Sequence, residues 1–160
     1  MVEDKALFKV DLYAQHLNDY KHSVSCIDGV PFYPPGNSKE GKDETTFNQY
    51  IENTLIEKLK RVGQYDPQSD LTLFIAVKSL DFSLIHSRWY ISLYVGVPEL
   101  GIKDLVVTKE MPFDRDVFNL IKSCENAQNV LPEGMQKTIN QVITDVNNHK
   151  SEDKFFNKSL

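Results

Sequence analysis

Alternation of apolar and polar positions marks several strands along this chain. Residues 7–13 read LFKVDLY, in which Phe8, Val10 and Leu12 alternate with polar neighbours. This is the period of a half-buried strand, whose successive side chains point to opposite faces. A hairpin is the simplest link between the strands predicted at 71–78 and 88–97, and the alternation continues through their connection at 79–87. Four further strands are predicted, the first of them weakly patterned, at 22–30, 71–78, 88–97 and 104–111.

Two segments have the three-to-four spacing of amphipathic helices instead. The first is 46–62, where Thr46 and Gln49 fit a capping box and Gly63 suits the position after the last turn. The second is 132–146, with Pro132 in its first turn. The polar tail 147–160 is expected to be mobile or to dock weakly. A short helical or irregular segment is expected to cover the core with Phe113, Val117, Phe118 and Ile121.

The order of these elements predicts an α+β fold. Two strands, a helix, three strands and a helix suit a two-layer sandwich, with a mainly antiparallel sheet of four to five strands. Each helix has one narrow apolar stripe, so both amphipathic helices are expected to pack on one face of the sheet. The other face would be open to solvent or to a partner. The chain of 160 residues is expected to form a single domain, with its compact part at about 7–146.

Composition and charge narrow the functional classes. Hydrophobic residues make up 41% and charged residues 26%, which excludes a wholly disordered or collagen-like chain. The net charge of −5 makes binding to nucleic acid or to an anionic membrane surface a poor expectation. No apolar stretch has the length of about 18–20 residues that a bilayer span needs.

No pattern in the sequence indicates catalysis, a cofactor or a metal. The four histidines have no metal-ligand spacing, and solvated loop positions are expected for them; they are His16, His22, His86 and His149. There is no Gly-rich nucleotide-binding motif and no nucleophile elbow. We therefore expect no catalytic residue. The turn-rich segment 31–42 is long for a connection, and such loops are often functional.

Aromatic residues supply the candidates for a partner-binding surface. In 88–97 the period of two places Arg88, Tyr90 and Tyr94 opposite Trp89. If Trp89 joins the core, these three lie on the open face, and Tyr and Arg are enriched at protein interfaces. The alternative is that aromatic residues here only pair across strands, as they do in many sheets. Phe32 and Tyr33 are added to the candidates because they can pin the 31–42 loop.

The two cysteines leave two alternatives open. Cys26 and Cys124 lie 98 positions apart and form no CxxC motif. They are either a disulfide, which would indicate an extracytoplasmic compartment, or two free thiols of the kind common in cytosolic proteins.

Three segments together resemble small periplasmic lipoproteins of Gram-negative bacteria, including the type that assists lipopolysaccharide assembly at the outer membrane. They are a strand and Pro-rich loop followed by the helix at 46–55, the strand pair at 71–77 and 89–95, and the closing helix at 139–146. The resemblance implies two helices on a mostly antiparallel sheet, and a binding or assembly role without catalysis. Members are tethered by a lipidated N-terminal cysteine. This chain has no such cysteine, so membrane contact is expected only through an anchor absent from it.

These observations give three functional hypotheses. The first is a non-enzymatic module that binds a protein partner on the periplasmic side of the bacterial envelope. The second is a cytosolic acidic inhibitor or immunity-type protein, whose charge of −5 would suit a basic partner. The third is a small enzyme or ligand carrier with a pocket near residues 31–45.

Overall fold

The computed structural model describes residues 5–18, 25–27, 29–35 and 46–159, with side chains up to residue 149. Part of the predicted strand 22–30 and most of the 31–45 loop therefore lie outside the described residues. The elements are β1 (Lys9–Leu12), η1 (Ala14–His16), β2 (Ser25–Ile27), β3 (Val30–Pro31), α1 (Phe47–Arg61), β4 (Thr72–Ser83), β5 (Arg88–Val97), η2 (Pro98–Leu100), β6 (Ile102–Pro112) and α2 (Leu120–Ser159).

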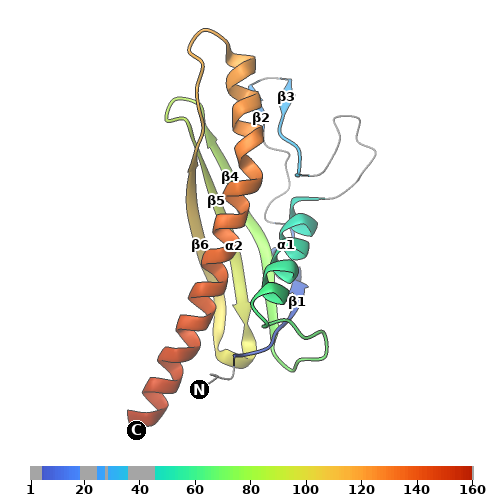
Figure 1. The fold of residues 1–160 in the computed structure, drawn as a ribbon, viewed down its shortest axis with the longest axis vertical. Coiled ribbons are helices and arrows are strands. Elements are labelled where there is room, and N and C mark those ends of the chain that lie inside the picture. Colours follow the sequence, from blue (N-terminus) through green and yellow to red (C-terminus); the bar gives the residue numbers. More distant parts are fainter. Residues whose placement is uncertain (1–4, 19–24, 28, 36–45, 160) are drawn as a thin grey trace.

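The main sheet has four strands in the order β1-β4-β5-β6. β1 runs parallel to β4, and the other neighbours are antiparallel. α1 packs against β1 and β4, while α2 packs against β5 and β6, so both helices cover the same face (Figure 1). The predicted α+β fold, with two helices on a mainly antiparallel sheet, is confirmed.

The first helix forms where its sequence signals place it. The backbone N–H of Gln49 donates to Oγ1 of Thr46 at 3.0 Å, and the backbone N–H of Thr46 donates to Oε1 of Gln49 at 3.0 Å. This is the predicted capping box, which satisfies two backbone donors that the first turn leaves free. The buried stripe of α1 consists of Phe47, Ile51, Leu55 and Leu59.

The second helix is much longer than predicted. The sequence placed its start at Pro132 and a polar tail from residue 147, but α2 extends from Leu120 to Ser159 with Pro132 inside it. Proline lacks the N–H that would bond the carbonyl four residues back, which normally disfavours a helix interior. The buried stripe nevertheless continues on both sides of Pro132, with Ala127, Leu131 and Met135 all fully buried. Tertiary packing therefore outweighs the local preference.

The sheet and α2 approach each other closely at one point. A Cβ atom on Gly134 would lie 2.8 Å from Cδ1 of Ile91 and 2.9 Å from Cβ of Met111. Only a glycine allows this approach, because those distances are shorter than carbon–carbon contacts. The contact fixes where α2 crosses the sheet.

Aromatic side chains fill the core toward the β4–β5 turn. The Trp89 ring is fully buried and its Nε1 donates to the carbonyl of Ala127 at 2.9 Å. Phe32 and Phe82 pack against the Trp89 ring with centroid distances of 4.5 and 5.1 Å, and Phe113 stacks on Phe82 at 5.2 Å. Trp89 therefore faces the core, which meets the condition under which Arg88, Tyr90 and Tyr94 lie on the opposite face.

Two local predictions were wrong. The described part of the weak strand predicted at 22–30 belongs to a two-stranded hairpin, β2–β3, separate from the main sheet. In the segment after β6, Phe113 is buried, but Val117, Phe118 and Ile121 are 64%, 96% and 50% exposed. These three side chains therefore do not cover the core. Apolar character alone predicted their burial, but large apolar side chains are also common on protein surfaces.

Candidate functional site

Large exposed apolar side chains gather at one end of the molecule. Eight such side chains occur among the residues that the structure describes, and five of them lie on the β4–β5 turn, the segment after β6 or the first turn of α2. We call this group the apolar end. Its members, with their exposed fractions, are Ile85 (79%), Val117 (64%), Phe118 (96%), Leu120 (49%) and Ile121 (50%).

Hydrogen bonds hold the two loops of the apolar end together. The Arg115 guanidinium donates to the carbonyls of Leu84 and Ile85, each at 3.4 Å. The backbone N–H of Phe113 donates to the carbonyl of Ser87 at 3.0 Å. Within the second loop, the Asp116 carboxylate accepts from the backbone N–H of Phe118 at 2.9 Å. Ile85, Val117 and Phe118 are thus presented by a bonded loop pair, and Leu120 and Ile121 follow in the first turn of α2.

A disulfide ties the β2–β3 hairpin to the same end. Cys26 on β2 and Cys124 on α2 are bonded, with their Cα atoms 5.8 Å apart. Of the two alternatives that the sequence left open, the structure has the bonded pair. The bond attaches a two-stranded hairpin, which is only marginally stable by itself, to the first turns of α2.

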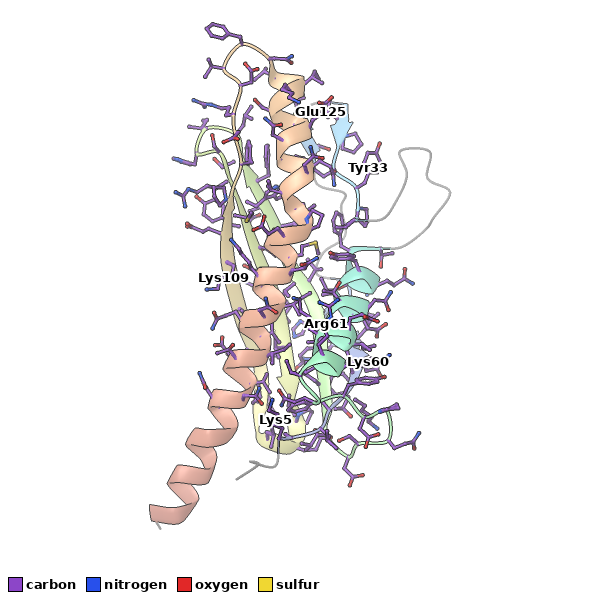
Figure 2. All side chains as sticks on the ribbon, in the orientation of Figure 1. Lys5, Tyr33, Lys60, Arg61, Lys109 and Glu125 are labelled. Atoms are coloured by element: carbon purple, nitrogen blue, oxygen red, sulfur yellow. A yellow bond between two sulfur atoms is a disulfide. The ribbon has the colours of Figure 1, made fainter. Side chains whose placement is uncertain are left out.

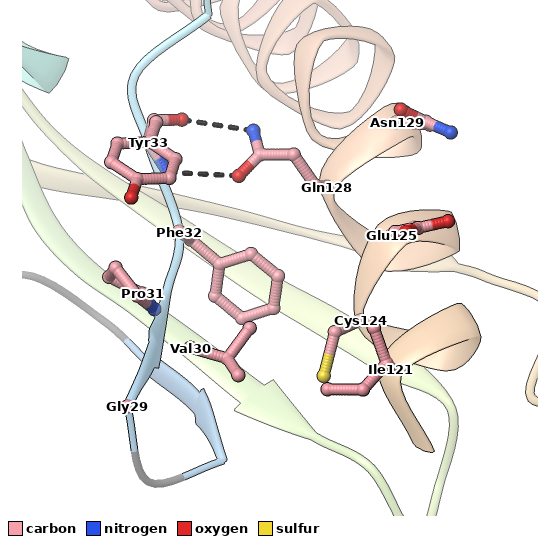
Figure 3. Close-up of a pocket in the computed structure, with 10 residues that line it drawn as sticks. All are labelled: Gly29, Val30, Pro31, Phe32, Tyr33, Ile121, Cys124, Glu125, Gln128 and Asn129. Carbon is pink, nitrogen blue, oxygen red and sulfur yellow. Dashed lines mark hydrogen bonds between the residues drawn. The ribbon is translucent and has the colours of Figure 1, made fainter. Parts of the chain in front are cut away.

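A pocket of about 440 Å³ lies between this hairpin and α2 (Figure 3). One side of it is held by a double hydrogen bond. The backbone N–H of Tyr33 donates to Oε1 of Gln128 at 2.9 Å, and Nε2 of Gln128 donates to the carbonyl of Tyr33 at 3.0 Å. The residues that line the pocket are Gly29, Val30, Pro31, Phe32, Tyr33, Ile121, Cys124, Glu125, Gln128 and Asn129.

Phe32 and Tyr33, the two aromatic candidates that the loop supplied, have different surroundings in the structure. Phe32 is only 3% exposed and packs between Phe82 and Trp89, so it contributes to the core and to the pocket wall. It is not available on the outer surface. Tyr33 is half-buried and lies at the pocket, as does Glu125 of α2 (Figure 2). Both loop candidates therefore line the pocket. The third sequence hypothesis expected a pocket near residues 31–45, and Phe32 and Tyr33 are two residues of that segment that line one.

Arg88, Tyr90 and Tyr94 lie on the sheet face opposite the buried Trp89, Ile91 and Leu93. Arg88 is exposed and its Nη1 lies 2.7 Å from Oε2 of Glu110 on β6. Tyr90 is half-buried. Tyr94 is stacked against the His16 ring of η1, with ring centroids 3.8 Å apart. The open face is therefore covered at the Tyr94 position and accessible near Arg88.

The cover over Tyr94 is a polar cluster around one carboxylate. Oδ1 of Asp104 accepts from Tyr13 at 2.9 Å and from Gln15 at 3.0 Å, and it lies 2.7 Å from Nε2 of His16. The Tyr13 ring lies on Gly96, where a Cβ atom would approach it to 2.8 Å. These contacts pin η1 across β5 to the start of β6.

The same contacts shift two pKa values. Hydrogen bonds from His16 and then Tyr13 hold the pKa of Asp104 below its ordinary value, because they stabilise the charged form. Burial, followed by the hydrogen bond to Asp104, raises the pKa of Tyr13. The expectation of a solvated His16 was wrong: its side chain is 15% exposed. Its Asp104 partner is 88 positions away along the chain, so the residues around His16 do not predict this contact.

Other site types find no support in the described part of the chain. Among the described residues there is no group of three His, Cys, Asp or Glu side chains that could hold a metal ion. None of the described helices combines the length and apolar character of a membrane span. Comparisons with protein-family models, with characterised proteins and with solved structures gave no match.

Proposed function

We propose that this chain is a non-enzymatic module that binds a protein partner through its apolar end, on the periplasmic side of the bacterial envelope. One observation carries the proposal: five of the eight exposed large apolar side chains in the described residues lie at one end of the molecule, on two bonded loops and the first turn of α2. Scattered exposed apolar residues are normal, but a contiguous group marks an interaction surface.

The disulfide supports the compartment. Disulfides persist in oxidising compartments, and cytosolic thiols are kept reduced. The Cys26–Cys124 bond therefore favours an exported protein over a cytosolic acidic inhibitor. The resemblance to small periplasmic lipoproteins adds the expectation of an assembly role in the envelope.

A thiol count tests the compartment. Protein isolated from its native compartment without reductant should show no free thiol after denaturation, and its mass should rise by two hydrogens on reduction. The control is the same sample treated with reductant before the count. Two free thiols in the untreated sample would contradict export and would favour the cytosolic alternative.

Site-specific photo-crosslinking tests the surface. A photoreactive phenylalanine analogue at position 118, which is 96% exposed, should give a discrete crosslink to one protein in living cells. The crosslink should weaken when Ile85→Ser is added, because Ile85 belongs to the same apolar end. Position 62 is the control, since Val62 is exposed (41%) but lies outside the apolar end. The same pattern from both positions, or none from position 118, would contradict the proposal.

A further inference from the structure

The pocket adjoins the apolar end through a single residue. Ile121 lines the pocket and is also one of the exposed apolar side chains, with half of its surface accessible. Leu120, its neighbour in the first turn of α2, is equally exposed at 49% but does not line the pocket. A partner seated on the apolar end would therefore cover the mouth of the pocket as well.

The walls and the rim of the pocket differ in chemistry. Val30, Pro31, Phe32, Ile121 and the half-cystine Cys124 form apolar walls. The volume of about 440 Å³ lies in the range of about 300–1,000 Å³ that is typical of ligand sites. It is ample for one bulky apolar side chain together with the stem of a neighbouring one.

Glu125 adds a carboxylate to the pocket lining. Among the described residues that line the pocket, Glu125 is the only charged one. Lys122 Nζ lies 3.9 Å from the Glu125 carboxylate, but both side chains are more than half exposed and the pair is at the limit of an ion pair. Such surface pairs are weak, so Glu125 can engage a ligand cation. Gln128 is less available, because both ends of its amide bond the backbone of Tyr33.

The pocket is held in shape before any ligand arrives. The disulfide fixes β2 to α2, the Gln128 amide fixes Tyr33 to α2, and Phe32 is locked against Trp89. A site built in this way loses little conformational entropy on binding, which favours affinity.

We propose that the pocket receives a bulky apolar side chain of the partner protein, from a segment that also places a Lys or Arg against Glu125. The apolar side chain would bury against Val30, Phe32 and Ile121, and the cation would lie at the rim. This proposal rests on the proposed function, because it names the chemistry of the segment that the partner would present. Buried anchors in preformed pockets dominate the energetics of many protein interfaces.

A peptide library tests this chemistry. The full-length oxidised protein is used to select from a phage-displayed library of random peptides, and the selected peptides are synthesised and measured by fluorescence anisotropy. The expected result is enrichment of sequences with a bulky apolar residue close to a Lys or Arg. Ile121→Asp should weaken binding of these peptides about tenfold or more, the effect of losing an interface anchor.

Matched variants separate the pocket from its surroundings. Leu120→Asp is the control for Ile121→Asp, because the two positions are neighbours with equal exposure and the same helix turn. Glu125→Gln should weaken binding about threefold or more and remove the preference for cations, an effect typical of a charged rim contact. Glu133→Gln is its control, since Glu133 is exposed on the same helix and does not line the pocket.

Several outcomes would overturn the inference. They are selection of no peptide above background, enrichment of peptides without a cation, and equal losses from Leu120→Asp and Ile121→Asp. Failure of the two proposals is distinguishable. A crosslink at position 118 without peptide binding would leave the apolar end as the interface and refute the pocket. Peptide binding that depends on Ile121 without any crosslink at position 118 would refute the wider interface and retain the pocket.

Discussion

The two ends of the molecule are built from the same two layers but finish in opposite ways. At the apolar end, large apolar side chains remain exposed around the β4–β5 turn. At the other end, near the start of β4, the core is closed by a buried amide: Gln64 is 4% exposed and its Nε2 donates to the carbonyl of Ala6 at 3.1 Å and to Oδ1 of Asn147 at 2.9 Å. We call this second region the polar end (Figure 1).

The two ends differ in degree: Leu7 and Val62 are 42% and 41% exposed beside the polar end, whereas the five side chains of the apolar end are 49–96% exposed. At the polar end, Gln64 links the N-terminal segment to α2 through hydrogen bonds with Ala6 and Asn147. Nδ2 of Asn147 donates back to Oε1 of Gln64 at 3.1 Å, so the two amides bond each other twice. Satisfied buried amides of this kind rigidify a core. The described residues show no such buried amide pair among the five side chains of the apolar end, which is the surface that we propose for partner binding.

Removal of the disulfide at the apolar end should cause the largest loss of stability. The bond closes a loop of 98 residues, and the chain-entropy model gives about 4–5 kcal/mol of stability for a loop of that length. A Cys26→Ala/Cys124→Ala variant should lose that amount in denaturant unfolding. The wild-type protein in excess reductant is the control and should match the variant. A loss below about 1 kcal/mol would show that packing alone holds the hairpin to α2.

Gln64→Ala should have the next largest effect, and at the polar end. Truncation removes the donor for Ala6 and the reciprocal pair with Asn147, and loss of such a buried hydrogen-bonding group costs about 1–3 kcal/mol. Gln68→Ala is the control, because Gln68 is exposed in the same loop. Urea unfolding of both variants measures the difference. Equal, small losses would mean that the polar end does not depend on its amide.

The smallest expected effect concerns the polar cluster on the open face. The pKa of Asp104 is lowered in the folded protein, so its carboxylate stabilises the fold above the ordinary value of 3.8 and loses that contribution as the pH falls below it. Asp104→Asn should therefore reduce the loss of thermal stability between about pH 6 and pH 3. Asn tolerates the positive φ of 51° at this position, so the variant tests charge rather than backbone strain. An unchanged pH dependence would contradict the role of the cluster.

Much of the fold follows from local sequence signals. The capping box of α1 and the alternation of β5 depend on residues within a few positions of one another, and both elements lie where they were predicted. The long α2 does not follow from such signals, because Pro132 is a local stop that packing overrides. A strong local rule therefore failed where a buried stripe continued past it.

The candidate site was less accessible to prediction because it is assembled from distant segments. The period of two placed Tyr94 on the open face. It could not predict that the His16 ring stacks on Tyr94, because the two residues are 78 positions apart. The pocket joins Tyr33 to Gln128 across 95 positions. Exposure of Phe118 was also missed, because an apolar residue by itself predicts burial.

The disulfide also changes how the chain responds to cleavage. Together with the backbone it makes residues 26–124 a covalent ring that contains α1, β4, β5 and β6, with β1 and most of α2 as two tails outside it. A single proteolytic nick inside the ring opens it but leaves both fragments attached. The nicked protein would run as one band without reductant and as two bands with it, while a cut in either tail releases a piece at once.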